Sequence, residues 1–155
     1  MHKLVFGSVG YGVTDVILSK HDELTEQYVL DLKITTITEH SGASINPKGL
    51  GLQLALDTKL ESGKIKDYPE YGVSDVDVLE VLDLEEYDCL VETPTNIYDR
   101  APTQTNKLKA VNVKKDIVNS KKLILALNFK ALIECTYENN IQFHFETSIG
   151  GAILF

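Results

Sequence analysis

Three glycines near the start of the chain are the residues most suited to binding a ligand through the backbone. Gly7, Gly10 and Gly12 follow a strand-like apolar run and precede a stretch with the apolar spacing of a helix. Glycines at such a joint permit a tight turn, allow close approach of a pyrophosphate, and leave helix N-terminal amides facing its oxygens. The pattern predicts a dinucleotide site whose pyrophosphate is held by Gly7, Ser8, Val9 and Gly10.

The spacing of these glycines is G-x-x-G-x-G, which differs from the usual dinucleotide fingerprint G-x-G-x-x-G. Two alignments are open. Either Val5 occupies the first glycine position, or Gly7 does and the loop is about two residues short. A strand–turn–helix joint that binds nothing has the same pattern, so the glycines alone do not decide between a ligand site and a simple turn.

Glu39 favours the ligand interpretation. It stands at the end of a β-branched run, where a carboxylate can accept hydrogen bonds from the adenosine ribose of NAD. No arginine lies beside it to receive the 2′-phosphate of NADP, and we interpret His40 as a solvent-exposed turn residue. The cofactor is therefore expected to be NAD or NADP, with NAD favoured by Glu39.

Composition limits the classes of partner. The 155 residues suffice for one domain, and the net charge of −8 argues against binding to nucleic acid or an anionic membrane surface. Cys89 and Cys135 lie in apolar stretches without metal-ligand spacing and are expected to be buried thiols. The chain opens on a strand-like run and has no long apolar segment, so a cytoplasmic location is expected.

Six short β-like runs alternate with helical patterns, which predicts an α/β fold. We expect one Rossmann-type domain over residues 1–155, with a mostly parallel, doubly wound sheet of about six strands and helices on both faces. The expected strands are 3–6, 33–38, 77–82, 88–92, 123–127 and 141–147, and the expected helices are 12–28, 50–60, 103–119 and 130–139. Residues 42–51 are expected to form a loop and 62–77 an exposed connection, with Leu50, Leu54 and Leu60 near one helix face.

Three later segments resemble the homoserine dehydrogenase family. Residues 87–96, Y-D-C-L-V-E-T-P-T-N, are similar to the family's D-V-V-V-E-A-T-P-T-N. Residues 119–128, N-S-K-K-L-I-L-A-L-N, are compared with G-K-H-V-V-T-A-N-K, and residues 145–152, F-E-T-S-I-G-G-A, with Y-E-A-T-V-G-G-G. The three motifs occur in the family's order, and the match covers essentially the whole chain.

The resemblance implies a function. The family interconverts aspartate semialdehyde and homoserine by hydride transfer with NAD or NADP, in the synthesis of threonine, methionine and isoleucine. Carried over by position, it places Thr93, Pro94, Thr95 and Asn128 on the nicotinamide side of the cofactor. It also gives Glu146 a role in holding a monovalent cation, although a carboxylate that caps a strand end is the alternative.

Several departures from the family pattern argue against independent catalysis. The family's second domain dimerises, binds substrate and supplies an aspartate and a lysine, and it is expected to be absent because the chain ends at Phe155. The family's Asn-Lys pair is interpreted as Asn128-Phe129, so the lysine that reaches cofactor and substrate is counted as lost. The proline after the last glycine turn is replaced by Leu154. No catalytic residue is therefore assigned.

Three functions remain open at this stage. The chain is a nucleotide-binding module without catalysis of its own, half of an active dehydrogenase completed by a partner chain, or an interaction protein that uses the fold as a scaffold. The apolar tail, residues 152–155, is the expected contact for a second copy or for the missing domain.

Overall fold

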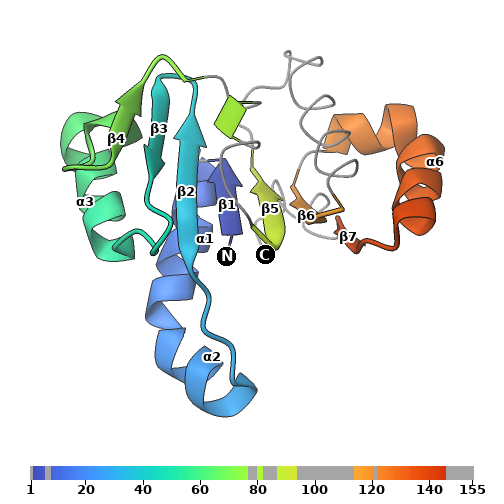
Figure 1. Ribbon diagram of the computed structural model, residues 1–155, viewed down its shortest axis with the longest axis horizontal. Coiled ribbons are helices and arrows are strands. Elements are labelled where there is room, and N and C mark those ends of the chain that lie inside the picture. The colour runs from blue at the N-terminus through green and yellow to red at the C-terminus, as the bar shows by residue number, and fades with distance from the viewer. Residues whose placement is uncertain are drawn as a thin grey trace, which may run out of the picture.

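The computed structural model describes residues 2–5, 8–76, 80–81, 87–93, 114–120 and 122–145, with backbone only for 2–5, 8 and 122–128. The described part contains a seven-stranded sheet in the order β4-β3-β2-β1-β5-β6-β7 (Figure 1). The strands are β1 (His2–Val5), β2 (Ile34–Glu39), β3 (Gly42–Ile45), β4 (Gly72–Ser74), β5 (Cys89–Glu92), β6 (Asp116–Asn119) and β7 (Phe143–His144). The helices are α1 (Ser8–Ser19), α2 (His21–Tyr28), α3 (Leu52–Ser62), the 3-10 turn η1 (Ile65–Asp67) and α6 (Lys122–Asn139).

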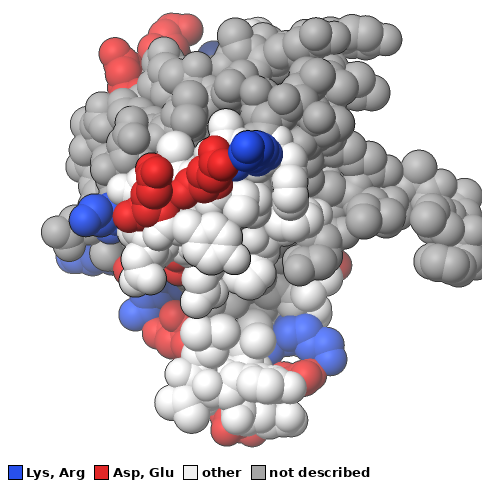
Figure 2. All heavy atoms as spheres, turned by 90° about the vertical axis from the view of Figure 1, so that its right-hand side faces the viewer, with Lys and Arg blue, Asp and Glu red and all other residues white. Residues whose placement is uncertain are grey.

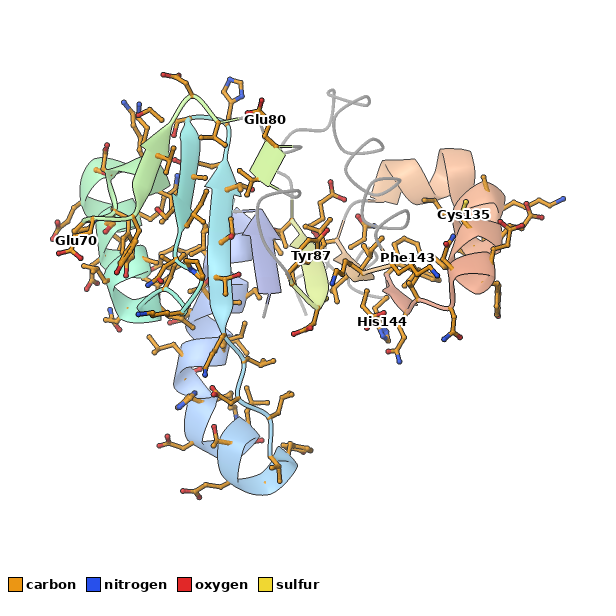
Figure 3. All side chains as sticks on the ribbon, in the orientation of Figure 1. Glu70, Glu80, Tyr87, Cys135, Phe143 and His144 are labelled. Atoms are coloured by element: carbon orange, nitrogen blue, oxygen red, sulfur yellow. The ribbon has the colours of Figure 1, made fainter. Side chains whose placement is uncertain are left out.

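Helices cover both faces of the sheet, as a doubly wound fold requires. Successive residues of a strand point to opposite faces, and β5 shows this directly. Val91 packs against the core cluster that α1 and α3 cover, whereas Leu90 belongs to a second cluster with Tyr87 and Ile117. Cys135 of α6 packs against this second cluster, and Figure 3 shows Tyr87, Phe143 and Cys135 on that half of the molecule. The expected fold class is therefore confirmed.

A bulge in β2 sets which way its side chains point. His2 of β1 pairs with Ile34, but the next residue, Lys3, pairs with Thr36, so Thr35 is inserted. An extra residue shifts the alternation of a strand by one position beyond the bulge. Ile34 and Ile37, three apart, consequently lie in the same core cluster. By the same alternation Glu39 faces that side, toward α3 and η1.

The sheet extends beyond β2 by a hairpin that the sequence analysis did not predict. Residues 42–51 were expected to be a loop, yet β3 pairs antiparallel with β2 and β4 pairs antiparallel with β3. The expected exposed connection 62–77 contains η1 and β4, with Ile65 fully buried. Two glycines make this close packing possible, because a Cβ on Gly42 would lie 2.3 Å from the Val73 carbonyl oxygen and one on Gly72 would lie 1.9 Å from that of Lys66.

Other expected elements are confirmed or displaced. The strands at 3–6, 33–38, 88–92 and 141–147 correspond to β1, β2, β5 and β7. The expected helix 12–28 begins earlier, at Ser8, and is divided into α1 and α2. The expected strand 123–127 is wrong, because α6 covers it, and the expected helix 103–119 is wrong at its end, because β6 occupies 116–119. Most of the expected strand 77–82 lies outside the described residues, and Glu80 and Val81 are helical. None of the described helices combines the length and apolar character that crossing a bilayer requires.

The buried face of α3 differs from the one expected. Leu56 is 3% exposed and packs in the first core cluster, whereas Leu54 and Leu60 are 44% and 69% exposed. The two outer leucines therefore add little to the core, and their spacing misled the sequence analysis because leucine recurs on both sides of this helix.

This difference predicts a large contrast between two identical substitutions in one helix. Leu56→Ala should lower the free energy of unfolding by about 2–5 kcal/mol, because it leaves a cavity in the core. Leu60→Ala should change it by less than about 0.5 kcal/mol, because its side chain is already in solvent. Urea denaturation followed by circular dichroism measures both, and equal losses would contradict the observed orientation of α3.

Candidate functional site

The candidate site lies where the chain reverses its direction of travel across the sheet. From β1 the chain passes through β2, β3 and β4 on one side and then returns to β5, β6 and β7 on the other. β1 pairs in parallel with both β2 and β5, so the carboxyl ends of these strands lie at the same edge of the sheet (Figure 1). In open α/β sheets the crevice at this reversal is the usual ligand site.

The first turn of α1 lies at this edge of the sheet, directly after β1. Ser8, Val9 and Gly10 were expected to form a loop, but they are the first residues of the helix, directly after Phe6 and Gly7, which lie outside the described residues. Unpaired amides of a first turn and the positive end of the helix dipole both attract anions. α1 has no acidic residue in its first turn, so nothing of this chain's sequence there neutralises that end.

The residues of this turn differ in their burial. Gly10 is buried and its carbonyl oxygen accepts a hydrogen bond from the Thr14 hydroxyl at 2.9 Å. Val9 is 49% exposed, and Tyr11 packs against the first core cluster. Tyr11 is thus directed toward the core rather than only toward solvent. The helix begins at Ser8, earlier than expected, and the role of its first amides as a phosphate site stays a prediction.

Glu39 is at the carboxyl end of β2, as expected, but its carboxylate already has three donors from the protein. Oε1 accepts hydrogen bonds from the Ser41 hydroxyl at 2.6 Å and the Ile65 amide at 2.7 Å. Oε2 accepts one from Lys59 Nζ of α3, and the Glu39 side chain is only 9% exposed. Lys59 Nζ also donates to the Gly63 carbonyl oxygen at 2.6 Å. A ribose at this position must share the carboxylate with these donors.

Lys59 contributes the cation of this cluster and was not predicted from the sequence. Its side chain is 26% exposed and therefore accessible from solvent at the end of β2. Helical spacing places residue 59 on α3 but does not bring it near residue 39, because that contact depends on the bulge in β2. The lack of an arginine after β2 in the sequence therefore does not mean that positive charge is missing beside Glu39.

Thr93 follows β5 at the adjacent position in the crevice and is only 3% exposed. Pro94 and Thr95, also expected in the site, lie outside the described residues. Two residues that the sequence analysis did not select lie beside Thr93. Glu92 and Asn119 pair in register at the ends of β5 and β6 and are 1% and 0% exposed. The signal available in the sequence was Glu92, a carboxylate at the end of an apolar strand.

The position assigned to Asn128 is corrected by the register of β6. β6 is Asp116–Asn119, and it pairs in parallel with β5. Asn128 instead lies inside α6, several residues beyond that strand. Aligning the strand of the motif K-H-V-V-T-A-N-K with β6 gives residues 115–122, K-D-I-V-N-S-K-K. In this alignment Lys122 falls at the position of the motif's final lysine, whereas the alignment that places Phe129 there depends on a strand at 123–127 that the structure does not contain.

The remaining chemistry of the described residues is sparse. Desolvation by burial, and then repulsion from Asp116 and Asp88, raise the pKa of the Cys89 thiol to about 11, so it is a poor nucleophile at neutral pH. Cys89 and Cys135 are both unbridged and half-buried. Within the described ranges no group of three or more histidine, cysteine or acidic residues is placed to hold a metal ion. Glu146 and the tail 152–155 lie outside those ranges.

Comparisons with known proteins agree with this geometry. No protein-family profile matches the chain. A homoserine dehydrogenase from Methanocaldococcus jannaschii is 39% identical over 151 residues, which cover 96% of this chain and 44% of that protein.

Solved structures show the same fold. Homoserine dehydrogenase from Thermoplasma acidophilum superposes with a TM-score of 0.80 at 15% identity, covering 100% of this chain and 46% of its own. A mutant of a hyperthermophilic archaeal homoserine dehydrogenase, solved in complex with NADPH, superposes with a TM-score of 0.82 at 22% identity, covering 95% of this chain and 43% of its own. The S. aureus homoserine dehydrogenase at pH 8.5 superposes with a TM-score of 0.67 at 24% identity, covering 94% of this chain and 31% of its own.

The chain spans less than half the length of each of these relatives. Its match is nonetheless nearly complete on its own side, and it includes the strands and the helix that form the crevice. By sequence the chain is similar to a little under half of the M. jannaschii homoserine dehydrogenase, and it shares its fold with the solved homoserine dehydrogenase structures.

Proposed function

We propose that this chain binds a nicotinamide dinucleotide in the crevice between the carboxyl ends of β1 and β5. The observation that carries the proposal is the start of α1, a helix without first-turn acidic residues that begins at the reversal point of the sheet. A pyrophosphate is the anion that this position receives in folds of this kind. A related archaeal homoserine dehydrogenase crystallised with NADPH supports the choice of ligand.

The residue roles follow the geometry of the crevice. Amides of Ser8, Val9 and Gly10, together with Gly7, hold the pyrophosphate, and Glu39 contacts the adenosine ribose. Thr93, Pro94 and Thr95 border the nicotinamide. The part that the sequence analysis gave to Asn128 passes to residues 120–122, because these follow β6 directly.

The choice between NAD and NADP depends, in this proposal, on the pair of Glu39 and Lys59. Glu39 repels a 2′-phosphate and accepts hydrogen bonds from a 2′-hydroxyl, which favours NAD. Lys59 offsets part of that repulsion because it binds the carboxylate directly. The preference for NAD is therefore expected to be modest, and it is supported only by the position of the carboxylate.

A second proposal is that the chain takes part in hydride transfer between homoserine and aspartate semialdehyde when further polypeptide completes it. Lys122 at the start of α6 favours this, because it restores the motif lysine beside the nicotinamide end of the crevice. The relatives are more than twice as long as the matched region, so the additional polypeptide would supply the substrate contacts.

We also propose a cytoplasmic location, supported by the two unbridged cysteines. The cation role of Glu146 stays a prediction.

Titration with NADPH and NADH, followed by cofactor fluorescence or calorimetry, tests the first proposal, and binding that does not saturate at millimolar cofactor would contradict it. Gly10→Ala should weaken binding at least about tenfold, because a methyl group is added at the buried first turn. Gly12→Ala is the matched control. An added Cβ there has nothing within 4 Å, so binding should be unchanged and the helix slightly more stable.

The cofactor preference is tested by two variants at the end of β2. Glu39→Gln should raise the affinity for NADPH relative to NADH about fivefold, because Lys59 then faces the 2′-phosphate without a competing carboxylate. Lys59→Ala should shift the same ratio in the opposite direction. Lys64→Ala, which removes an exposed neighbouring lysine, serves as the control, and equal ratios in all variants would refute the role of the pair.

The second proposal is tested in a chimera that joins this chain to the part of the M. jannaschii enzyme that it does not match. Homoserine-dependent reduction of NAD or NADP should appear in the chimera and fall at least about a hundredfold with Lys122→Ala. Lys121→Ala should cost only a few-fold. A folded chimera that binds cofactor but shows no such reduction would argue against hydride transfer.

A further inference from the structure

An arm formed by residues 20–33 projects from the body of the molecule at the amino end of β2 (Figure 1). It consists of α2 and the extended segment that returns to the sheet. α2 has eight residues and none of them is buried, although it packs beside the end of α1. An isolated helix of this length is only marginally stable in water. Because none of its residues is buried, α2 gains little further stability from contacts with the core.

The tip of the arm presents apolar side chains to solvent. Tyr28, Val29 and Leu30 are 66%, 89% and 44% exposed. In Figure 2 the arm is the lower projection, and the side in view carries mainly uncharged groups with charged groups at its margins. Val29 closes α2 in the left-handed conformation, at φ 55°, where glycine is usual and a β-branched residue is strained. The chain thus keeps a large apolar side chain in a position that neither burial nor backbone preference favours.

A groove of about 390 Å³ lies at the base of the same arm. Apolar residues form most of its lining, and they include Ile17, Leu18, Leu32, Ile34, Leu50 and Leu52. Lys33 and Lys48 add positive charge to it. Lys48 makes no ion pair with another described residue, whereas Lys33 Nζ lies 3.2 Å from an oxygen of Asp31. The groove is therefore apolar with a cationic margin.

We propose that the tip of the arm of one molecule, Tyr28–Asp31, docks in this groove of a second copy of the chain. The tip and the groove are complementary, because three apolar side chains are followed by a carboxylate that can meet Lys48 of the partner copy. Each chain carries both the arm and the groove, so two chains can exchange arms reciprocally, and in this proposal the exchange closes as a twofold dimer. The groove is at the amino end of β2, whereas Glu39 is at the opposite end, so the exchange leaves the proposed nucleotide crevice accessible.

Sedimentation of the full chain across a range of concentrations tests this docking. The wild type should show a monomer–dimer equilibrium, and Val29→Asp should raise the dissociation constant at least about tenfold, because it places a charge at the apolar contact. Aspartate tolerates the left-handed conformation and the site is exposed, so this variant should still fold. Leu60→Asp, at another exposed leucine on α3, should leave the equilibrium unchanged.

A charge exchange identifies the contact itself. Asp31→Lys and Lys48→Asp should each weaken the dimer several-fold, and the double variant should recover most of the loss because the pair is re-formed across the interface with reversed signs. A wild type that stays monomeric at about 100 µM, a dimer insensitive to Val29→Asp, or a double variant no better than the worse single one would each overturn the proposal.

Discussion

The pairing of β1 with a parallel strand on each side is the constraint on which the described structure depends. Three residues of β1, His2–Leu4, pair with both β2 and β5. The strands that follow β2 and those that follow β5 extend the sheet on opposite sides of β1. Because these three strands are parallel, the residues that follow each of them lie at the same edge of the sheet. The start of α1, Glu39 and Thr93 are brought together by this pairing, although they are distant in sequence.

The bulge at Thr35 adds the second level of positioning. It changes the side to which β2 directs its last residues, and so it joins the carboxylate of Glu39 to α3 and η1 rather than to the opposite face. As a result, the carboxylate already accepts hydrogen bonds from donors of its own chain. Under the proposed function, ligand selectivity at this point depends on both members of the ion pair, Lys59 as well as Glu39.

The strands β1, β2, β5 and β7 were predictable from the sequence, because alternation of helical and strand patterns is local information. The strand Cys89–Glu92 and the position of Glu39 followed from runs of β-branched and apolar residues. β6 was missed because its four residues follow a lysine-rich stretch that is equally typical of a helix. The family motif was then aligned to the apolar residues that follow, which α6 uses as a helix. The contact of Lys59 with Glu39 depends on a bulge, which leaves no local signal in the sequence.

Gly72 shows how a residue remote from the crevice constrains it. The Lys66 carbonyl occupies the space in which a side chain at position 72 would begin, so any larger residue must displace η1 from β4. η1 also carries the Ile65 amide that binds Glu39, and the Ile65 carbonyl oxygen accepts the hydroxyl proton of Ser44 in β3. Widening this outer corner of the sheet would therefore withdraw a donor from the carboxylate and leave one of its oxygens open to a sugar hydroxyl. A substitution in this edge strand can in this way change the environment of Glu39 without altering Glu39 or any of its hydrogen-bond donors.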